Sequence, residues 1–246
     1  MADSRIQPVG DSALRIQLGE GIDPGVNRRV RAACAALERA SLRGVVEWVP
    51  GYAAVTVHYL PHVVRFHELS RAVEATIASG KELEVPAAHL VTLPVFYGGE
   101  RGPDLQFVAE HHGLSVDEVI DLHSRPEYLV YMIGFAPGFP YLGGLPQRLV
   151  TPRLEKPRLS VPKGSVGIGG AQTGVYSVDS PGGWRLIGRT PVPLYDPGQE
   201  RPSLLQAGDR VRFRAVGARD YDDIDQGVKS GSYAVERRPV REDGTR

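Results

Sequence analysis

Cysteine, net charge and long apolar runs are scarce or absent in this 246-residue chain. Its single cysteine, Cys34, excludes an intramolecular disulfide, and Val26, Val30 and Leu37 surround it at helical spacing, which predicts a buried helical thiol rather than a reactive one. Lys plus Arg and Asp plus Glu number 29 each, so no overall attraction to nucleic acid or an anionic membrane is expected. No apolar run is long enough to span a bilayer, and the N-terminus lacks the apolar core of a signal peptide. We therefore expect a cytoplasmic protein.

The common nucleotide-binding and hydrolase motifs are also missing. A Walker A loop needs a glycine before Gly-Lys-Ser/Thr, and Gly80-Lys81 has neither that glycine nor the hydroxyl residue. The glycines at 167, 169 and 170 match a dinucleotide fingerprint only in part. Ser165 stands where a hydrolase elbow places its nucleophile, but Lys163 replaces the first glycine of that motif. The sequence therefore predicts neither a P-loop nor a nucleophilic serine.

The histidines do not form a metal-binding pattern. His58 and His62 are four residues apart, yet Pro61 lies between them, so they cannot share a helical face. His111 and His112 are adjacent and point in different directions. We predict no metal site on this chain.

Periodicity predicts two domains. A strand at 13–18, a helix capped by Asp23-Pro24, two strands at 45–49 and 53–59, and a helix at 66–79 give the order βαββα of a ferredoxin-like α+β domain, expected over residues 1–87. Residues 81–88 are expected to form a linker. A strand at 90–96 then begins the second domain.

The second domain, expected over residues 88–217, is predicted to be a β-barrel or sandwich. Two short helices are expected first, one ending at Gly113 and one beginning with the capping box of Ser115 and Glu118. Strands are predicted at 128–135, 165–168, 174–178, 184–187 and 211–216. Residues 218–246 are expected to be a polar tail with at most one helical turn, and the last ten residues are expected to be disordered.

One stretch, residues 131–191, stands out by its composition. It contains 12 of the 29 glycines and 8 of the 20 prolines, and seven Lys or Arg against two acids. Glycine permits close backbone approach and proline fixes turns, so this stretch is expected to form stiff, basic loops that hold an anion. A turn-rich barrel with a solvated basic face explains the composition equally well.

Two arginines in this stretch each follow a proline, Arg153 in TPR and Arg158 in KPR. A guanidinium on a stiff loop can hold a carboxylate or phosphate in two parallel hydrogen bonds. Gln172, Thr173 and Tyr176 add neutral hydrogen-bonding groups nearby. The alternative is that both arginines are exposed and pair with acidic side chains at the surface.

The same stretch resembles a known family. GFAPGFPYLGGLP at 134–146, TPR and PR within 151–158, VPKGSVGIGGAQTGVY at 161–176 and SPGGWRLIGRTP at 180–191 are similar to the signature of the 5-oxoprolinase B-subunit family, also called the Kip inhibitor (KipI) or allophanate hydrolase subunit 1 family. The resemblance covers about residues 5–216. It includes LPVFYGGERGPDL, LHSRPEYLVYMIGF, EWVPGYAAVTVHY and GDRVRF.

The resemblance implies a small α/β domain followed by a cyclophilin-like β-barrel. It also implies a role as one component, inactive alone, of an ATP-dependent hydrolase that converts 5-oxoproline to glutamate. The implied partners are a C subunit of the KipA or allophanate hydrolase subunit 2 type and an A subunit of the LamB/YcsF type. Related domains occur in urea carboxylase. In an alternative branch the protein inhibits a sensor histidine kinase through its barrel. Barrel type alone transfers no prolyl isomerase activity.

Combined with this resemblance, the charge pattern suggests which residues form the site. Oxoproline carries a carboxylate and ATP carries phosphates, so basic and hydrogen-bonding groups are expected to contact them. The predicted catalytic contacts are Arg153, Arg158 and Gln172. The predicted substrate- or anion-binding residues are Lys163, Thr173, Tyr176, Arg189, His123 and Tyr131. The family usually has a small residue where this chain has Lys163. No nucleophile is among these residues, so the chemistry is expected to need a partner protein.

Overall fold

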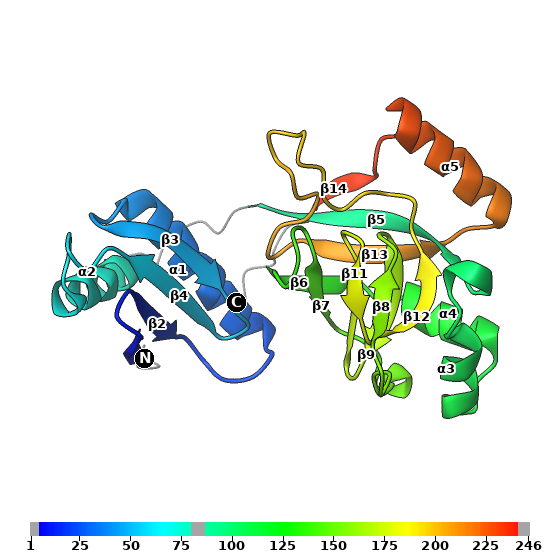
Figure 1. Ribbon diagram of the computed structural model, residues 1–246, viewed down its shortest axis with the longest axis horizontal. Helices are drawn as coiled ribbons and strands as arrows, with labels where there is room; N and C mark the ends of the chain where they lie inside the picture. The colour runs from blue at the N-terminus through cyan, green and yellow to red at the C-terminus, as the bar shows by residue number, and fades with distance from the viewer. Residues whose placement is uncertain (1–4, 80–86, 241–246) are drawn as a thin grey trace. The chain divides into compact units, whose positions relative to one another are not determined.

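The computed structural model describes residues 5–79 and 87–240. The chain divides into two compact units, Met1–Ala87 and Ala88–Arg246 (Figure 1). The linker expected at 81–88 falls almost entirely outside the described residues, and the first strand of the second unit begins at Ala88.

The first unit is a four-stranded antiparallel sheet with two helices. The strands β1 (Arg5–Val9), β2 (Ala13–Gln17), β3 (Val45–Pro50) and β4 (Ala54–Tyr59) lie in the order β1-β2-β4-β3. The helices are α1 (Pro24–Ala40) and α2 (Phe66–Ser79). Buried residues of the sheet, such as Leu14 and Val55, pack with Val30 of α1 and Val73 of α2 in one core. The separate small sheet with helices is thereby confirmed.

Local chemistry explains how α1 begins and ends. The Asp23 carboxylate accepts a hydrogen bond of 2.9 Å from the backbone N–H of Val26, and Pro24 occupies the first helical turn, as predicted. The helix ends at Ser41, which has a left-handed conformation with φ 43°. Cys34 lies on this helix, partly buried and packed against the core.

Strand β1 was not predicted from the sequence. Its residues, RIQPV, include a proline and are almost all exposed, so they show no alternation of apolar and polar side chains. The strand exists because its backbone pairs with β2 from Arg5 opposite Gln17 to Val9 opposite Ala13.

The second unit is a β-barrel of seven strands. The ring runs β12-β9-β10-β7-β6-β13-β5, and pairing of β12 with β5 closes it. Only the β5–β13 pair is parallel among the pairs of the ring. The strands are β5 (Ala88–Tyr97), β6 (Tyr128–Ile133), β7 (Pro140–Gly143), β9 (Ser165–Gly169), β10 (Gln172–Val175), β12 (Arg185–Arg189) and β13 (Arg210–Ala215).

Two helices, α3 (Leu105–His112) and α4 (Val116–Ser124), contribute to the barrel core. The helix ends follow the sequence prediction. Gly113 ends α3 with φ 62°, and Ser115 and Glu118 form both hydrogen bonds of the capping box of α4. Val108 of α3 and Val119 of α4 are fully buried against barrel residues such as Phe213.

A two-stranded sheet of β8 (Arg158–Val161) and β11 (Ser180–Gly182) accompanies the barrel. The sequence did not predict these two strands, nor β7 and β14 (Arg237–Val240). They are only three or four residues long, too short to show a period of two.

The expected polar tail differs most from the structure. Residues Ala218–Ser230 form a three-turn helix, α5, and Arg237–Val240 form β14, which pairs with β5. Tyr221 of α5 is buried beside Phe96, an edge-to-face contact of 6.3 Å that the polar composition of the tail conceals. Of the last ten residues, 241–246 lie outside the described residues.

Candidate functional site

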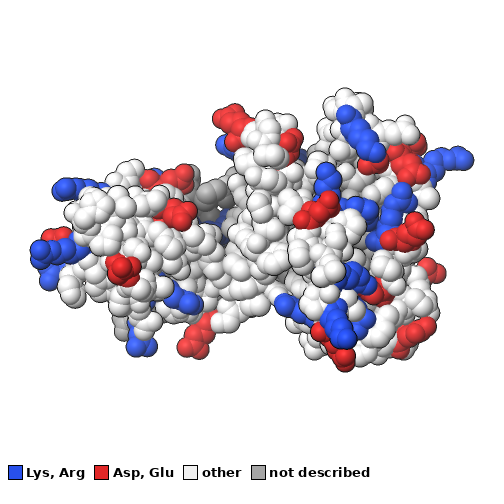
Figure 2. All heavy atoms as spheres, viewed as in Figure 1, with Lys and Arg blue, Asp and Glu red and all other residues white. Residues whose placement is uncertain are grey.

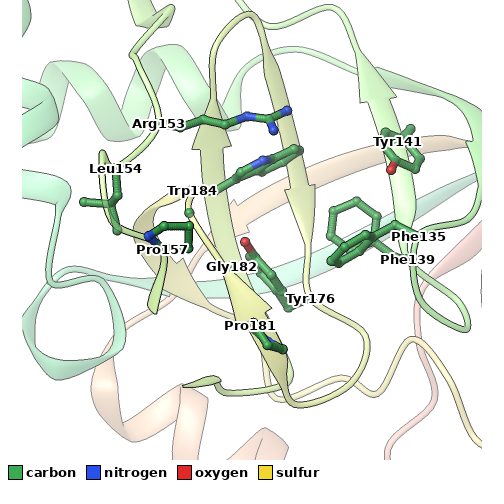
Figure 3. Close-up of a pocket in the computed structure, with 11 residues that line it drawn as sticks. Phe135, Phe139, Tyr141, Arg153, Leu154, Pro157, Tyr176, Pro181, Gly182 and Trp184 are labelled. Carbon is green, nitrogen blue, oxygen red and sulfur yellow. The ribbon is translucent and has the colours of Figure 1, made fainter. Parts of the chain in front are cut away.

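An aromatic pocket lies on the barrel unit. Its volume is about 310 Å³, and its walls come from the loop after β6, β7, the loop before β8, the end of β10 and the β11–β12 region (Figure 3). We call it the aromatic pocket. It is lined by Phe135, Phe139, Tyr141, Arg153, Leu154, Pro157, Tyr176, Pro181, Gly182, Gly183 and Trp184.

Edge-to-face contacts hold the aromatic side chains in place. The Phe139 ring lies 5.7 Å from Trp184 and 5.6 Å from Tyr176, with interplanar angles of 79° and 77°. Nearby glycines make this packing possible. A Cβ at Gly169 would lie 2.5 Å from Trp184 Nε1, and one at Gly182 would lie 2.2 Å from the Tyr176 hydroxyl. The glycine content of the stretch therefore accommodates a cluster of rings.

Phe135 reaches the pocket through an unusual turn. Its φ is +68°, a left-handed value that is rare for a bulky residue, and the Ala136 N–H donates to the Gly134 carbonyl at 2.8 Å across it. The side chain is 67% exposed and packs edge-to-face on Phe139 at 5.4 Å. A strained backbone that presents an exposed ring to a pocket points to recognition.

Arg153 supplies the charge of the aromatic pocket. Its guanidinium carbon lies 5.8 Å from the centre of the Trp184 ring, above the indole in Figure 3. The loop is fixed by backbone hydrogen bonds, from Leu154 to Gly183 at 2.7 Å and between Thr151 and Gly170. Among the residues that the structure describes, the Arg153 guanidinium has no hydrogen bond or ion pair. It is therefore available to an anionic ligand.

Arg158 is already paired, although it follows a proline just as Arg153 does. One terminal nitrogen, Nη2, lies 2.9 Å from both carboxylate oxygens of Asp104, and Nη1 donates to the Trp184 carbonyl at 3.2 Å. Asp104 Oδ2 also accepts from the Leu186 N–H at 2.6 Å. The Arg158 contact therefore connects β8, α3 and β12. Arg158 pairs with an acidic side chain as in the alternative interpretation, but that acid, Asp104, is buried rather than at the surface.

His123 and Thr173 lie in the barrel core, away from solvent. Tyr97 Oη and Thr173 Oγ1 each lie 2.8 Å from a ring nitrogen of His123, and Thr173 Oγ1 donates to the Gly167 carbonyl at 3.0 Å. Because the Thr173 proton is used, Oγ1 accepts from Nε2–H, and Nδ1 accepts from Tyr97. Burial lowers the pKa of His123 from 6.5 to about 3. The imidazole is neutral and structural in this arrangement.

The remaining predicted residues lie in different places. Tyr176 lines the aromatic pocket, and burial raises the pKa of its hydroxyl, partly offset by a hydrogen bond to the Trp184 backbone and by Arg153 and Arg158. Gln172 begins β10 after the tight turn from β9, and Tyr131 is buried on β6, where its ring covers Gly143.

Lys163 and Arg189 line a second, separate cavity of about 430 Å³ beside α5. We call it the basic pocket. The Nε of Arg189 donates to the Lys163 carbonyl at 3.0 Å, which joins the two residues. Of the predicted site residues, Arg153 and Tyr176 line the aromatic pocket, Lys163 and Arg189 line the basic pocket, and His123 and Thr173 lie in the barrel core. Arg158, Gln172 and Tyr131 line neither pocket.

Sequence reasoning missed the aromatic lining: Phe135, Phe139, Tyr141 and Trp184. Four rings among the glycines and prolines of 131–191 were the available signal. Within residues 5–79 and 87–240, no group of three or more His, Cys, Asp or Glu is placed to hold a metal ion. Over the same residues, no helix is both long and apolar enough to cross a membrane.

The arrangement can bind but offers little to react. A flat or ring-shaped ligand can stack on the aromatic walls while its anionic group meets Arg153. The buried neutral imidazole of His123 cannot reach a ligand there, because its two nitrogens are occupied and it is fully buried. The pocket therefore suits recognition of a small anionic ring.

Comparison with known proteins gives a consistent result. Residues 4–205 match the family described as "Carboxyltransferase domain, subdomain C and D". The chain is 46% identical to the B subunit of 5-oxoprolinase from Bacillus subtilis, with 88% of this chain and 95% of that protein covered. It is also 46% identical to the B subunit of 5-oxoprolinase from Haemophilus influenzae, with 86% and 98% covered.

Among solved structures, the crystal structure of TTHA0988 is similar with a TM-score of 0.74 and 39% identity. The match covers 84% of this chain and 40% of the TTHA0988 chain, which is therefore the longer of the two. The family match over most of the chain and the near full-length identity to named relatives show that this chain belongs to the 5-oxoprolinase B-subunit family, within the carboxyltransferase subdomain C and D family.

Proposed function

We propose that this chain is the B subunit of an ATP-dependent 5-oxoprolinase. The reaction is 5-oxo-L-proline + ATP + water → L-glutamate + ADP + phosphate. One observation carries the proposal: the 46% identity extends over 88% of this chain and 95% of a protein named as the B subunit of 5-oxoprolinase. The match therefore extends over nearly the whole length of that relative.

The aromatic pocket fits this substrate class. Oxoproline is a five-membered lactam with two apolar ring faces and one carboxylate. The rings of Phe139, Tyr176 and Trp184 offer stacking surfaces, and Arg153 offers above the indole a guanidinium that no described residue pairs with. In this proposal Arg153 binds the carboxylate, while Arg158 positions β8 through its ion pair with Asp104.

The chain is proposed to be inactive alone. The described part of the pocket contains a guanidinium and two phenols but no nucleophile or metal cluster, so water activation and ATP must come from elsewhere in a complex. The proposed partners are the A and C subunits of the enzyme. The longer chain of TTHA0988, of which this chain matches 40%, is consistent with such a partner joined to a B-type domain.

The test is reconstitution from purified proteins. This chain is mixed with the A and C subunits, and ADP release is measured with and without 5-oxoproline. We expect ADP release that requires 5-oxoproline and all three proteins. Omission of this chain is the control, and equal ADP release from the other two proteins alone contradicts the proposal. Urea and succinimide in place of 5-oxoproline test substrate choice in the same assay.

A further inference from the structure

The basic pocket lies beside α5 and shares no lining residue with the aromatic pocket. Two successive residues after β10 face different pockets: Tyr176 lines the aromatic pocket and Ser177 lines the basic pocket. Side chains of extended backbone alternate in this way. The other walls are the Lys163–Gly164 turn, the segment 189–194 and one face of α5. That helical face consists of Tyr221, Asp225, Val228 and Lys229.

Positive charge dominates the lining of this cavity. Arg101, Lys163, Arg189 and Lys229 line it, against Asp225 as the single lining carboxylate in the described structure. Basic side chains gather below α5 on the face shown in Figure 2, with acidic ones among them. The balance of the lining is thus three positive charges, from four cations and one anion.

Two of these cations are already engaged. Lys229 pairs with Asp225 at 2.5 Å, which neutralises the only lining carboxylate in the described residues. Arg101 pairs with Asp222 at 3.1 Å and stacks on the Tyr221 ring at 4.0 Å. The Arg101 contacts hold α5 against the barrel, whereas the Lys229–Asp225 pair lies within α5.

The charged groups of the other two cations, Lys163 and Arg189, are not paired within the described residues. Arg189 Nε donates to the Lys163 carbonyl, which orients the guanidinium. Within the described residues, neither terminal nitrogen of Arg189 has a hydrogen bond or ion pair. The Lys163 backbone N–H is held by Asp179 at 2.6 Å, so the turn is fixed while the ammonium has no hydrogen bond or ion pair within the described residues. Both side chains are prepared to meet an anion.

A buried hydroxyl lies in the same cavity. Ser177 is 4% exposed, and its Oγ has no hydrogen-bond partner among the residues described. Buried hydroxyls in folded proteins are nearly always partnered, so this one lacks its partner. Thr190 is nearby in the lining; its Oγ1 accepts from the Val192 N–H at 3.2 Å and keeps its own proton to donate.

We infer that the basic pocket is a binding site for a phosphate-class oxyanion. The Arg189 fork, the Lys163 ammonium and the Ser177 hydroxyl supply the donors that a tetrahedral anion needs. The two cations that are not paired with a carboxylate in the described structure, Lys163 and Arg189, suit a doubly charged phosphate better than a singly charged carboxylate. The anion is free phosphate or a phosphate group of a nucleotide. This inference does not depend on the proposed function, because it concerns binding to the chain alone.

The test is titration calorimetry of the full chain at low ionic strength with inorganic phosphate, ATP and acetate. We expect saturable phosphate binding that weakens about tenfold in Arg189→Met and in Ser177→Ala, because a charge-assisted hydrogen bond is lost in each. Lys156→Met removes one positive charge from an exposed position that lines neither pocket, and is the matched control. It should bind phosphate as the wild type does.

Stability separates a binding serine from a structural one. Removing an unpartnered buried hydroxyl should leave the unfolding midpoint of Ser177→Ala unchanged or raise it, by up to about 2–4 °C, while phosphate affinity falls. A serine with a structural role would show a lower midpoint instead. A lower midpoint with unchanged phosphate affinity contradicts the inference.

The remaining outcomes are also decisive. If ATP binds more tightly than phosphate and responds equally to Arg189→Met, the site holds a nucleotide phosphate; if ATP binds no more tightly, it holds free phosphate. Acetate that competes as well as phosphate overturns the phosphate assignment. So does a lack of saturable binding, or binding that Arg189→Met does not change. None of these results alters the reconstitution assay.

Discussion

The polar groups of the barrel unit fall into two kinds of region. In the core and at the β8–α3 junction they are fully partnered: His123 between Tyr97 and Thr173, and Arg158 with Asp104. In the two pockets they are not: within the described residues, the exposed Arg153 guanidinium has no hydrogen bond or ion pair, and the buried Ser177 hydroxyl has no hydrogen bond. Partnered buried groups stabilise the fold, and polar groups that a pocket leaves available mark recognition.

Arg158→Met is the strongest way to test the partnered side of this comparison. It leaves the Asp104 carboxylate, whose side chain is 11% exposed, with only the Leu186 N–H that binds it now. We expect the free energy of unfolding of the barrel to fall by about 2–3 kcal/mol, less than for a fully buried pair because Arg158 is partly exposed. Urea denaturation in a Trp48→Phe background measures it, with Trp184 as the reporter.

The control for this variant is Lys156→Met, which removes a positive charge from an exposed position in the same loop. It should change the unfolding free energy by less than about 0.5 kcal/mol. Equal stability of the two variants would show that the Arg158 ion pair is not structural.

Arg153→Met tests the unpartnered side. The reconstituted complex should lose about 10- to 100-fold in 5-oxoproline-dependent ADP release, because one charge-assisted hydrogen bond is worth roughly 1.5–3 kcal/mol. The unfolding free energy should stay within about 0.5 kcal/mol of wild type, since no protein partner is lost. Lys156→Met again serves as the control, now for activity. Undiminished activity of Arg153→Met would remove the aromatic pocket from the proposed substrate site.

The His123 network gives a pH dependence. The folded-state pKa of His123 is lowered by burial to about 3, below the ordinary value of 6.5, so the unfolded chain binds a proton first as pH falls. Stability contributed by the neutral imidazole is complete above about pH 6.5 and is lost progressively toward pH 3, by up to about 1.4 kcal/mol per pH unit.

Urea unfolding of wild type and His123→Gln at pH 7, 6 and 5, reported by Trp184 fluorescence, checks this. The variant should be less stable at pH 7 and should show a smaller slope, because glutamine does not titrate. Identical slopes for the two proteins are inconsistent with a buried neutral histidine.

Cys34 gives the smallest expected effect. A polar group that lacks a partner marks a binding site only where a ligand can reach it, and burial keeps ligands from the Cys34 thiol. Burial, followed by the nearby Glu38 charge, raises the pKa of the Cys34 thiol to about 12. We expect almost no thiolate at pH 8 and reaction with a disulfide reagent far slower in native protein than in urea. Equally fast reaction in both states would contradict this.

The sequence was most informative where structure is local. The Asp23 cap of α1, the Gly113 end of α3 and the Ser115–Glu118 capping box depend on residues within one helical turn, and all three are confirmed. Short strands such as β8 and β11, and the edge strand β1, have no periodicity of their own. They form because distant backbone segments pair with them, which the sequence does not display.

The candidate site shows the same limit. Composition identified residues 131–191 as basic and turn-rich, and resemblance named the family, which the comparisons confirm. The sequence could not show that Arg153 and Arg158 have different roles, because both follow a proline. The distinction comes from Asp104, which lies 54 residues away from Arg158 in the chain and beside it in space.

The sequence by itself therefore determined the family, the two-part organisation and three helix ends, because these depend on ordered motifs and neighbouring residues. Only the tertiary structure decided which polar groups are partnered. It placed His123 in the core, divided Tyr176 and Ser177 between two pockets and packed α5 beside Lys163 and Arg189. The physical reason is that a hydrogen-bond partner or a cavity wall is set by proximity in space, and barrel closure brings together residues far apart in the chain.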